Sequence, residues 1–319
     1  MVAPPTWSIV IPVHGGRDLL LACLDSLPDR PYVEVLVVDD GSQDGTADAV
    51  HGRHPRVNLL RNEEAAGFTR SANRGLDAAR GRFLLLLNSD TELHPGSLEA
   101  AEAAFADPGL GIAGAALHYP GGRPQWSGGP APTLAWLFGL ASGLPGQLRR
   151  LPGAGLLRPV AGSGGGAVDW VTGAALALRR QTWEEVGPMD PAFSFYAQDL
   201  DLCTRAREAG WGVAVAPDFR VLHHHGATIG TKRGAVGRQN PVMLWGDLLR
   251  WARKARGPEW ARRASLVLRA GTRLRLACRR VGDWAVRDAD ARAARRQESR
   301  EYRRALETLE RSAGGGDRL

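Results

Sequence analysis

A run of five apolar residues, Phe83–Leu87, leads directly into Asn88-Ser89-Asp90 and constrains the fold more than any other feature of the chain. An unbroken apolar run of this length after a turn residue, here Gly81, is typical of a strand buried on both faces. Ligands bind at the carboxyl edge of the open α/β sheets in which such strands occur. A carboxylate there suits Mg²⁺ or Mn²⁺, which in turn suit a diphosphate. The alternative interpretation is that Asp90 caps a following helix.

The first hundred residues alternate between apolar runs and helical patterns. The runs expected to be strands are 8–13, 33–38, 57–60 and 83–87. The expected helices are 18–26, a helix that begins near 45–46, 69–79 and 97–105. Because the connections are short, we predict an α/β fold with a Rossmann-like, mostly parallel sheet flanked by helices.

The middle of the chain changes character. Residues 120–168 are rich in Gly and Pro and predict a long loop or lid. A clear helix is expected over 199–210, with Asp201 and Arg205 spaced for an i,i+4 ion pair. The other regular elements expected here are a strand at 174–178, a short helix at 182–186 and strand-like segments at 213–216 and 220–222.

From Asn240 onward the sequence has a helical pattern. We therefore divide the chain into a body, residues 1–238, and a C-terminal extension, residues 239–319. Alternating spacings of three and four predict an amphipathic helix with a basic polar side. The stripe packs either on the body, on a second copy in a homodimer, or on anionic lipid headgroups. A charged helix with a disordered Gly-rich tail is expected over 287–319. The stripe consists of Trp260, Ala264, Val267, Gly271, Leu274, Cys278 and Val281.

Charge and cysteine content limit the function classes. Residues 229–319 hold 23 Lys and Arg against 10 Asp and Glu, whereas residues 1–228 hold 18 against 24. The basic extension is therefore expected to face phosphate, and the acidic body without a nucleic-acid motif argues against a nucleic-acid partner. Three distant cysteines argue against a disulfide scaffold or zinc site. Without a signal peptide or an apolar stretch of 18 residues, we expect a cytoplasmic protein, at most peripheral at the inner face of the plasma membrane.

Asp39-Asp40-Gly41-Ser42 follows the second predicted strand and so shares a sheet edge with Asp90. Asp40 is placed to accept from a base N–H or from ribose hydroxyls, and Gly41 allows a ligand to approach the backbone. A simple β-turn with Asx capping is the alternative for this sequence. Adjacent strand ends that converge on one cleft favour the ligand site.

Two further motifs carry groups of catalytic type. Asp199 lies at the start of a predicted helix, either as its cap or as a general base whose pKa the aromatic run 193–196 would raise by desolvation. His223-His224-His225 ends a strand. Because consecutive strand residues alternate faces, at most two of these histidines can serve one metal.

Six motifs in this order resemble glycosyltransferase family two, and most closely its bacterial rhamnosyltransferase-like subgroup, over about residues 7–250. The motifs that carry the resemblance are 8–14, 37–46, Gly67-Phe68 through Asn73-Arg74-Gly75-Leu76, 88–90, 170–174 and 198–205.

The resemblance implies a GT-A fold, a nucleotide-sugar donor, a divalent metal and inversion at the anomeric carbon. It places Asp90 on the metal, His223 as the second metal or diphosphate ligand five residues before Thr228, and Asp199 as the catalytic base. The implied donor pocket contains Pro12, Val13, His14, Asp39, Asp40, Gly67, Asn88 and Ser89. The implied acceptor side contains Trp170, Thr172, Gly173 and Gln198.

The resemblance further implies transfer of rhamnose or a similar sugar from a dTDP- or UDP-sugar to a cell-surface polysaccharide or lipid-linked acceptor. Two positions depart from the family pattern. Asn88-Ser89-Asp90 leaves one carboxylate for the metal, and Gln198 stands where the family carries Glu beside the base. With that neighbour neutral, Asp199 loses a like-charge effect that would raise its pKa. The alternative function is a nucleotide-sugar-binding protein with weakened catalysis.

Overall fold

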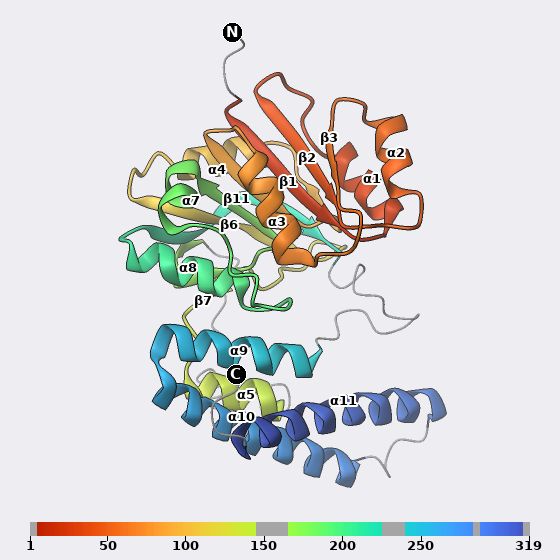
Figure 1. Cartoon of the computed structure of the whole chain (residues 1–319), viewed down its shortest axis with the longest axis vertical. Coiled ribbons are helices and arrows are strands. Elements are labelled where there is room, and N and C mark those ends of the chain that lie inside the picture. The colour runs from red at the N-terminus through yellow and green to blue at the C-terminus, as the bar shows by residue number, and fades with distance from the viewer. Residues whose placement is uncertain (1–4, 145–164, 225–239, 283–287, 315–319) are drawn as a thin grey trace. The chain divides into compact units, whose positions relative to one another are not determined.

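The computed structural model describes residues 5–144, 165–224, 240–282 and 288–314 (Figure 1). These residues form two compact units. Unit 1 comprises 1–130, 161–194 and 198–238, and unit 2 comprises 131–160, 195–197 and 239–319. The predicted domains, a body of residues 1–238 and an extension of residues 239–319, stay a prediction.

Unit 1 is built on one mixed sheet with the strand order β3-β2-β1-β4-β10-β6-β11-β5. The first four strands run parallel, β6 and β11 are parallel to each other, and β10 is antiparallel to both β4 and β6. The short strand β8 (Gly166–Ala167) adds to β11. The strands are β1 (Trp7–Val13), β2 (Val33–Asp39), β3 (Asn58–Arg61), β4 (Phe83–Leu87), β5 (Thr91–Leu93), β6 (Leu110–His118), β10 (Ala175–Arg179) and β11 (Gly212–His223).

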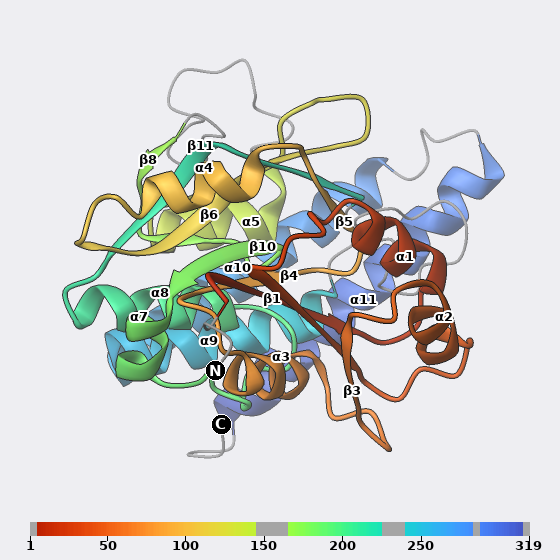
Figure 2. The ribbon, with the colours of Figure 1, turned by 90° about the horizontal axis from the view of Figure 1, so that it is seen from above.

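Helices cover both faces of this sheet, which confirms the predicted α/β class. Helix α3 lies along β1 and β2 on one face, while α4 lies along β6 and β11 on the other (Figure 2). A two-stranded sheet of β7 (Gly128–Gly129) and β9 (Trp170–Val171) completes the unit. The helices are α1 (Arg17–Asp25), α2 (Thr46–Arg53), α3 (Phe68–Ala78), α4 (Ser97–Ala104), α7 (Arg180–Val186) and α8 (Gln198–Glu208).

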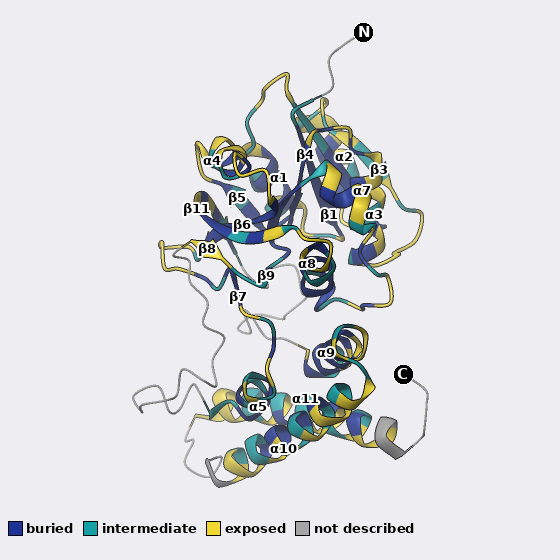
Figure 3. Cartoon of the chain, turned by 90° about the vertical axis from the view of Figure 1, so that its left-hand side faces the viewer, coloured by how far each residue is buried: buried dark blue, intermediate teal, exposed yellow. Residues whose placement is uncertain are grey.

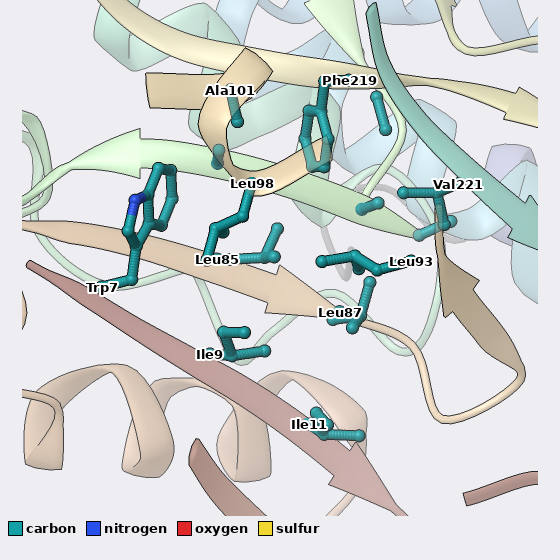
Figure 4. Close-up of a cluster of buried hydrophobic side chains, with 14 of the residues drawn as sticks. Trp7, Ile9, Ile11, Leu85, Leu87, Leu93, Leu98, Ala101, Phe219 and Val221 are labelled. Atoms are coloured by element: carbon teal, nitrogen blue, oxygen red, sulfur yellow. The ribbon is translucent and has the colours of Figure 1, made fainter. Parts of the chain in front are cut away.

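The period of two along the central strands places a buried apolar layer on the face that α1 and α4 cover. In Figure 4, Trp7, Ile9 and Ile11 of β1 point into the same layer as Leu85 and Leu87 of β4. All five side chains are buried. Truncating one such leucine to alanine typically costs about 2–5 kcal/mol of the free energy of unfolding, so this layer fixes the sheet that carries the site.

Unit 2 consists of four helices: α5 (Leu134–Ser142), α9 (Pro241–Arg256), α10 (Pro258–Gly282) and α11 (Ala289–Gly314). Helix α10 packs on α5, α9 and α11. A Cβ atom on Gly271 of α10 would lie 2.8 Å from Cβ of Ala141 in α5, so the glycine permits this close approach. Arg275 donates from Nε to the carbonyl of Ala141 and from Nη2 to that of Leu140, both at 2.7 Å, which satisfies the C-terminal end of α5.

The structure corrects several sequence predictions. The loop prediction for 120–168 is wrong at 134–142, where α5 begins after Thr133, whose side chain accepts from the N–H of Trp136. An apolar helix face can bury itself on other helices, and this tertiary contact overrides the Gly/Pro-rich context. Residues 145–164 lie outside the described part of the chain. Strands β5 and β6 were not expected, and the two segments predicted at 213–216 and 220–222 form one irregular strand, β11.

The predicted stripe in α10 packs within unit 2. Ala264 and Gly271 are buried, but Cys278 is exposed, so the stripe prediction is wrong at that position. Outward positions of α9, α10 and α11 are largely exposed (Figure 3). Within the described ranges, no helix has both the length and the apolar character that crossing a bilayer requires.

Two helical glycines provide a test of the packing of α3. A Cβ atom on Gly75 would lie 2.3 Å from Cγ1 of Val10 and 2.9 Å from Cγ2 of Val38, whereas one on Gly52 of α2 would meet nothing within 4 Å. We expect Gly75→Ala to lower the free energy of unfolding by about 1–3 kcal/mol through overpacking. Gly52→Ala should raise it by up to about 1 kcal/mol through helix propensity. Denaturant titration measures both, and equal effects would contradict the packing described.

Candidate functional site

The carboxyl ends of β1 and β2 lie side by side in parallel register, with Val13 opposite Asp39. The N–H of Asp40 donates to the carbonyl of Val13 at 2.7 Å, so the two strand ends stay joined beyond the ladder. Asp39 is fully buried, and its Oδ1 accepts from the N–H of Ser42 at 2.9 Å, the Asx-type bond that a turn requires. The turn interpretation of this motif is therefore confirmed, and the ligand site at the same sheet edge stays a prediction.

Asp40 holds the loop after β3 together. Its Oδ1 accepts from Asn62 Nδ2 at 2.7 Å, from the N–H of Ala66 at 2.8 Å and from Ser71 Oγ at 2.9 Å. Its Oδ2 accepts from the N–H of Gly67 at 2.9 Å. Burial alone would raise the pKa of Asp40, but these bonds outweigh burial and lower it below its ordinary value.

The lowered pKa of Asp40 makes its loop contacts dependent on pH. A carboxylate whose pKa is lower in the folded chain than in the unfolded chain stabilises the fold above the unfolded value. That contribution is lost as the pH falls through the folded pKa. Asp40 therefore organises the predicted donor pocket from within, and its Oδ2, with one described donor, retains the remaining acceptor capacity.

The end of β1 presents His14 at this edge. Its exposed imidazole lies with Nδ1 2.7 Å from the carbonyl oxygen of Asp40. Because a carbonyl only accepts, Nδ1 is the donor in this contact. Pro12 and Val13 are buried beneath it, and the N–H of Gly15 donates to Ser42 Oγ at 2.8 Å. The predicted base-pocket residues thus converge on the ends of β1 and β2.

The segment after β4 runs into a strand, not into a helix. Thr91 begins β5, which excludes a helix-capping role for Asp90. Ser89 and Asp90 are buried, and Asn88 Oδ1 is buried with no hydrogen-bond partner within the described residues. A buried, unsatisfied amide oxygen costs free energy unless a ligand or water completes it.

The carboxyl end of β11, at His223, faces the segment Asn88–Asp90. His223 is buried, and its Nε2 lies 3.5 Å from Oδ1 of Asp90. His224 points to the other side of the strand, where its Nε2 lies 2.7 Å from Oε1 of Glu92. The alternation expected of the histidine run is therefore present, and the run's last member and Thr228 lie outside the described residues.

A residue that the sequence did not single out completes this group. Gln125 is buried, and its Oε1 lies 3.0 Å from Nδ1 of His223. Its Nε2 donates to the carbonyl of His223 at 2.6 Å. A lone Gln in a Gly- and Pro-rich stretch carries no motif, so no sequence signal could have identified it.

Asp90 and His223 together form a donor set that fits a divalent cation. No group of three or more His, Cys, Asp and Glu side chains suited to a metal occurs among the described residues. Magnesium ions, however, are commonly held by one or two protein carboxylates together with substrate phosphates. One carboxylate, one imidazole and the nearby unsatisfied amide oxygen of Asn88 match that pattern.

Asp199 lies in the first turn of α8 with both oxygens held by backbone donors. Oδ2 accepts from the N–H of Gly173 and Oδ1 from the N–H of Leu200, each at 2.8 Å. Burial raises the pKa of Asp199 above its ordinary value, and the two N–H donors only partly offset this. A carboxyl group that is fixed in place and has a raised pKa fits proton transfer.

Hydrogen bonds connect Asp199 with the Asn88–Asp90 segment. The N–H of Asn88 donates to the carbonyl of Ala174 at 2.9 Å, and the neighbouring Gly173 holds Asp199. Asp201 instead pairs with Arg205 Nε at 2.9 Å, as predicted. The base candidate and the metal candidate thus belong to one continuous edge of unit 1.

The residues predicted for the acceptor side lie around the turn at Thr172–Gly173, whose Gly173 N–H donates to Asp199. Trp170 is buried, packs edge to face on Trp126 with ring centroids 4.3 Å apart, and donates from Nε1 to the carbonyl of Pro130. The N–H of Thr172 donates to the carbonyl of Ser127 at 3.0 Å. Gln198 is buried, and its Oε1 has no hydrogen-bond partner within the described residues.

The cysteines do not provide a nucleophile in unit 1. Burial raises the pKa of Cys23 and of Cys203 to about 12 each, so both are thiols at neutral pH.

Residues 8–149 match the family described as glycosyl transferase family 2. An N-acetylglucosaminyl-diphospho-decaprenol L-rhamnosyltransferase of Mycobacterium tuberculosis is 30% identical over 280 residues, which cover 82% of this chain and 90% of that protein. The O-antigen biosynthesis protein RfbC of Myxococcus xanthus is 29% identical over 70% of this chain and 18% of its own length.

Solved structures show the same fold. The mannosyltransferase PcManGT of Pyrobaculum calidifontis, in complex with GDP-Man and Mn²⁺, has a TM-score of 0.58 and 18% identity, covering 98% of this chain and 89% of that one. GalNAc-T7 with UDP, GalNAc and Mn²⁺ has a TM-score of 0.56 and 17% identity, and the match covers 77% of this chain and 47% of that one. At these identities the likeness shows the fold alone.

The pKa values of Asp40 and Asp199 should lie on opposite sides of the pKa of an ordinary aspartate, which is about 3.9. Asp199 should lie above this value because burial disfavours its charge, and Asp40 below it because four donors favour its charge. Carboxyl ¹³C NMR across a pH titration measures both. Asp199→Asn identifies the Asp199 signal, and an Asp199 pKa at or below the ordinary value would contradict the site described.

Proposed function

The chain belongs to glycosyl transferase family 2 and is a glycosyltransferase, and we propose that it moves rhamnose or a similar sugar from a dTDP- or UDP-sugar to an acceptor hydroxyl with inversion. The observation that carries this proposal is the hydrogen-bonded connection from Asp199 through Gly173 and Ala174 to Asn88, in the segment that holds Asp90. A base candidate with a raised pKa and a donor set for a diphosphate-bound cation lie on one hydrogen-bonded edge.

Asp199 serves as the general base in this proposal. Its carboxylate takes the proton of the acceptor hydroxyl while that oxygen bonds to the anomeric carbon, and the bond from this carbon to the diphosphate breaks. A single displacement of this kind inverts the anomeric configuration. The N–H groups of Gly173 and Leu200 hold the carboxylate in one orientation, so little reorganisation accompanies the proton transfer.

Asp90 and His223 hold Mg²⁺ or Mn²⁺ on the donor side. A divalent cation bound there stabilises the negative charge that develops on the leaving diphosphate. The glycosyltransferases of like fold solved with Mn²⁺ and a nucleotide or nucleotide-sugar support this assignment. Val13, His14, Asp39, Asp40 and Gly67 are assigned to the base and ribose, because they lie at the ends of β1 and β2 and in the loop that Asp40 organises.

The acceptor is proposed to be a saccharide, lipid-linked or part of a cell-surface polysaccharide. The relative from M. tuberculosis, whose name specifies a diphospho-decaprenol acceptor, supports this at 30% identity. Trp170 and the turn at Thr172–Gly173 adjoin Asp199, where an acceptor hydroxyl must lie to lose its proton. Gln198 adjoins the same place, and its unsatisfied Oε1 is available to an acceptor hydroxyl.

Asp199→Asn should lower the transfer rate by about 10²–10⁴-fold, because an amide cannot accept the proton. Donor binding, measured by calorimetry with a panel of dTDP- and UDP-sugars and Mn²⁺, should be unchanged. Glu208→Gln, at an exposed position of the same helix, is the control and should keep full activity. In the wild type the transfer rate should rise with pH through the raised pKa of Asp199, since only the carboxylate is a base.

Other outcomes would redirect the proposal. Full activity in Asp199→Asn would remove its assignment as base. Donor binding without transfer by the wild type would favour the alternative, a nucleotide-sugar-binding protein with weakened catalysis. NMR of the product distinguishes inversion from retention.

Peripheral contact with a membrane through unit 2 is the second part of the proposal. Helices α9 and α10 carry exposed cations at spacings of three and four, and Leu266 beside them is 57% exposed. Each cation near an anionic surface contributes about 1 kcal/mol of binding free energy. The exposed cations are Arg250, Arg253, Lys254, Arg256, Arg262 and Arg263.

Changing Arg250, Arg262 and Arg263 to Gln should weaken binding to phosphatidylglycerol vesicles by about 100-fold, as expected for three contacts of about 1 kcal/mol. The control changes three exposed cations of α11, Arg296, Arg300 and Arg303, to Gln and so removes the same charge elsewhere. Vesicle sedimentation measures both variants. Equal losses would indicate a net-charge effect without a defined surface, and binding to neutral phosphatidylcholine vesicles would contradict the electrostatic basis.

A further inference from the structure

Gln125 contacts His223 twice, once through the backbone and once through the imidazole. Gln125 lies between β6 and β7, with its backbone N–H donating to the carbonyl of Leu117 at 2.7 Å. Its side chain is 6% exposed. Both polar atoms of its amide contact His223, so Gln125 fixes the position of the backbone carbonyl and of the imidazole of that residue.

The hydrogen bonds fix which way the amide faces. Nε2 lies 2.6 Å from the carbonyl oxygen of His223 and 3.4 Å from that of His118. Two carbonyl oxygens accept only, so the amide nitrogen must be the atom that faces them. A flipped amide would place Oε1 against both carbonyls, which is repulsive. Oε1 therefore faces Nδ1 of His223.

The amide orientation in turn fixes the proton on the imidazole. Oε1 of Gln125 only accepts, so the 3.0 Å contact is a hydrogen bond only if Nδ1 of His223 carries a proton. In a neutral imidazole the other nitrogen, Nε2, then carries the acceptor lone pair. This lone pair is on the side of Asp90, since Nε2 lies 3.5 Å from Oδ1 of the carboxylate.

The amide of Gln125 thus sets the orientation of the imidazole whose Nε2 faces Asp90. We propose that Gln125 is a positioning residue that locks His223 in the Nδ1–H tautomer and so directs Nε2, together with Asp90, at the divalent cation of the donor. Such an outer partner of a ligating histidine typically changes metal affinity by 10–100-fold. The inference rests on the proposed function for the identity of the cation, but the tautomer is a property of this chain alone.

The first test reads the tautomer directly. Long-range ¹H–¹⁵N NMR of the ligand-free protein at neutral pH should show Nδ1 of His223 protonated and Nε2 unprotonated. Gln125→Met, which has similar length and no polar group, should lose this preference and shift toward the Nε2–H form that predominates in free histidine. Gln125→Glu keeps an acceptor for Nδ1–H and should retain the protonated Nδ1, although its second oxygen faces the carbonyl of His223 and should lower the melting temperature.

The second test reads the cation. Calorimetry with Mn²⁺ in the presence of UDP or dTDP should show 10–100-fold weaker metal binding in Gln125→Met and at most a small change in Gln125→Glu. Gln181→Met, at an exposed position of α7, is the matched control and should bind as the wild type does. Thermal melting separates a local effect from loss of the fold. If Gln125→Met does not fold, the wild-type spectrum and Gln125→Glu still decide.

The outcomes separate this inference from the proposed function. An Nε2–H tautomer or a doubly protonated imidazole in the wild type would overturn it, as would unchanged Mn²⁺ binding in a folded Gln125→Met. Absence of Mn²⁺ binding by the wild type with either nucleotide would overturn the metal assignment. The NMR arm would then still show whether Gln125 fixes the imidazole. A purely structural role for Gln125 would lower the melting temperature without moving the tautomer.

Discussion

The parallel pairing of β1 with both β2 and β4 is the constraint on which the rest of the site depends. Parallel strands end at the same edge, so the pairing delivers the residues after Val13, Asp39 and Leu87 to one place. The apolar layer around Ile9 and Leu85 holds the register, because a slip of one residue would turn these side chains toward the opposite face. The chemistry of the edge is therefore stabilised by residues that take no part in it.

Two aspartates at this edge show how local environment divides one residue type into two roles. Both Asp40 and Asp199 accept backbone hydrogen bonds, and burial opposes the charge of both. Asp40 has four donors, which outweigh burial, whereas Asp199 has two backbone donors from other residues, which do not. Their pKa values consequently move in opposite directions, so Asp40 is suited to hold a loop and Asp199 to exchange a proton.

Periodic features of the sequence predicted much of the fold, and contacts between distant segments account for what was missed. The alternation of apolar runs and helical patterns identified β1, β2, β4 and the edge they share, since that signal is local. Helix α5 was missed because its stability comes from packing on α10, which the surrounding glycines and prolines conceal. Gln125 was missed because its importance lies in contacts with His223, 98 residues away.

In the proposed site, the small donor set at Asp90 would link metal binding to donor binding. One carboxylate and one imidazole cannot complete the coordination of Mg²⁺ or Mn²⁺, so the remaining ligands must come from water or from the diphosphate. The negative charge of the diphosphate strengthens binding of the cation, and the cation strengthens binding of the diphosphate. A site with more carboxylates would bind metal alone and would gain less from the donor. The sparse set of ligands at Asn88-Ser89-Asp90 therefore favours a cation that binds and dissociates together with the nucleotide. Because the protein supplies so few ligands, the orientation of His223 accounts for a larger share of the protein's own contribution to metal affinity.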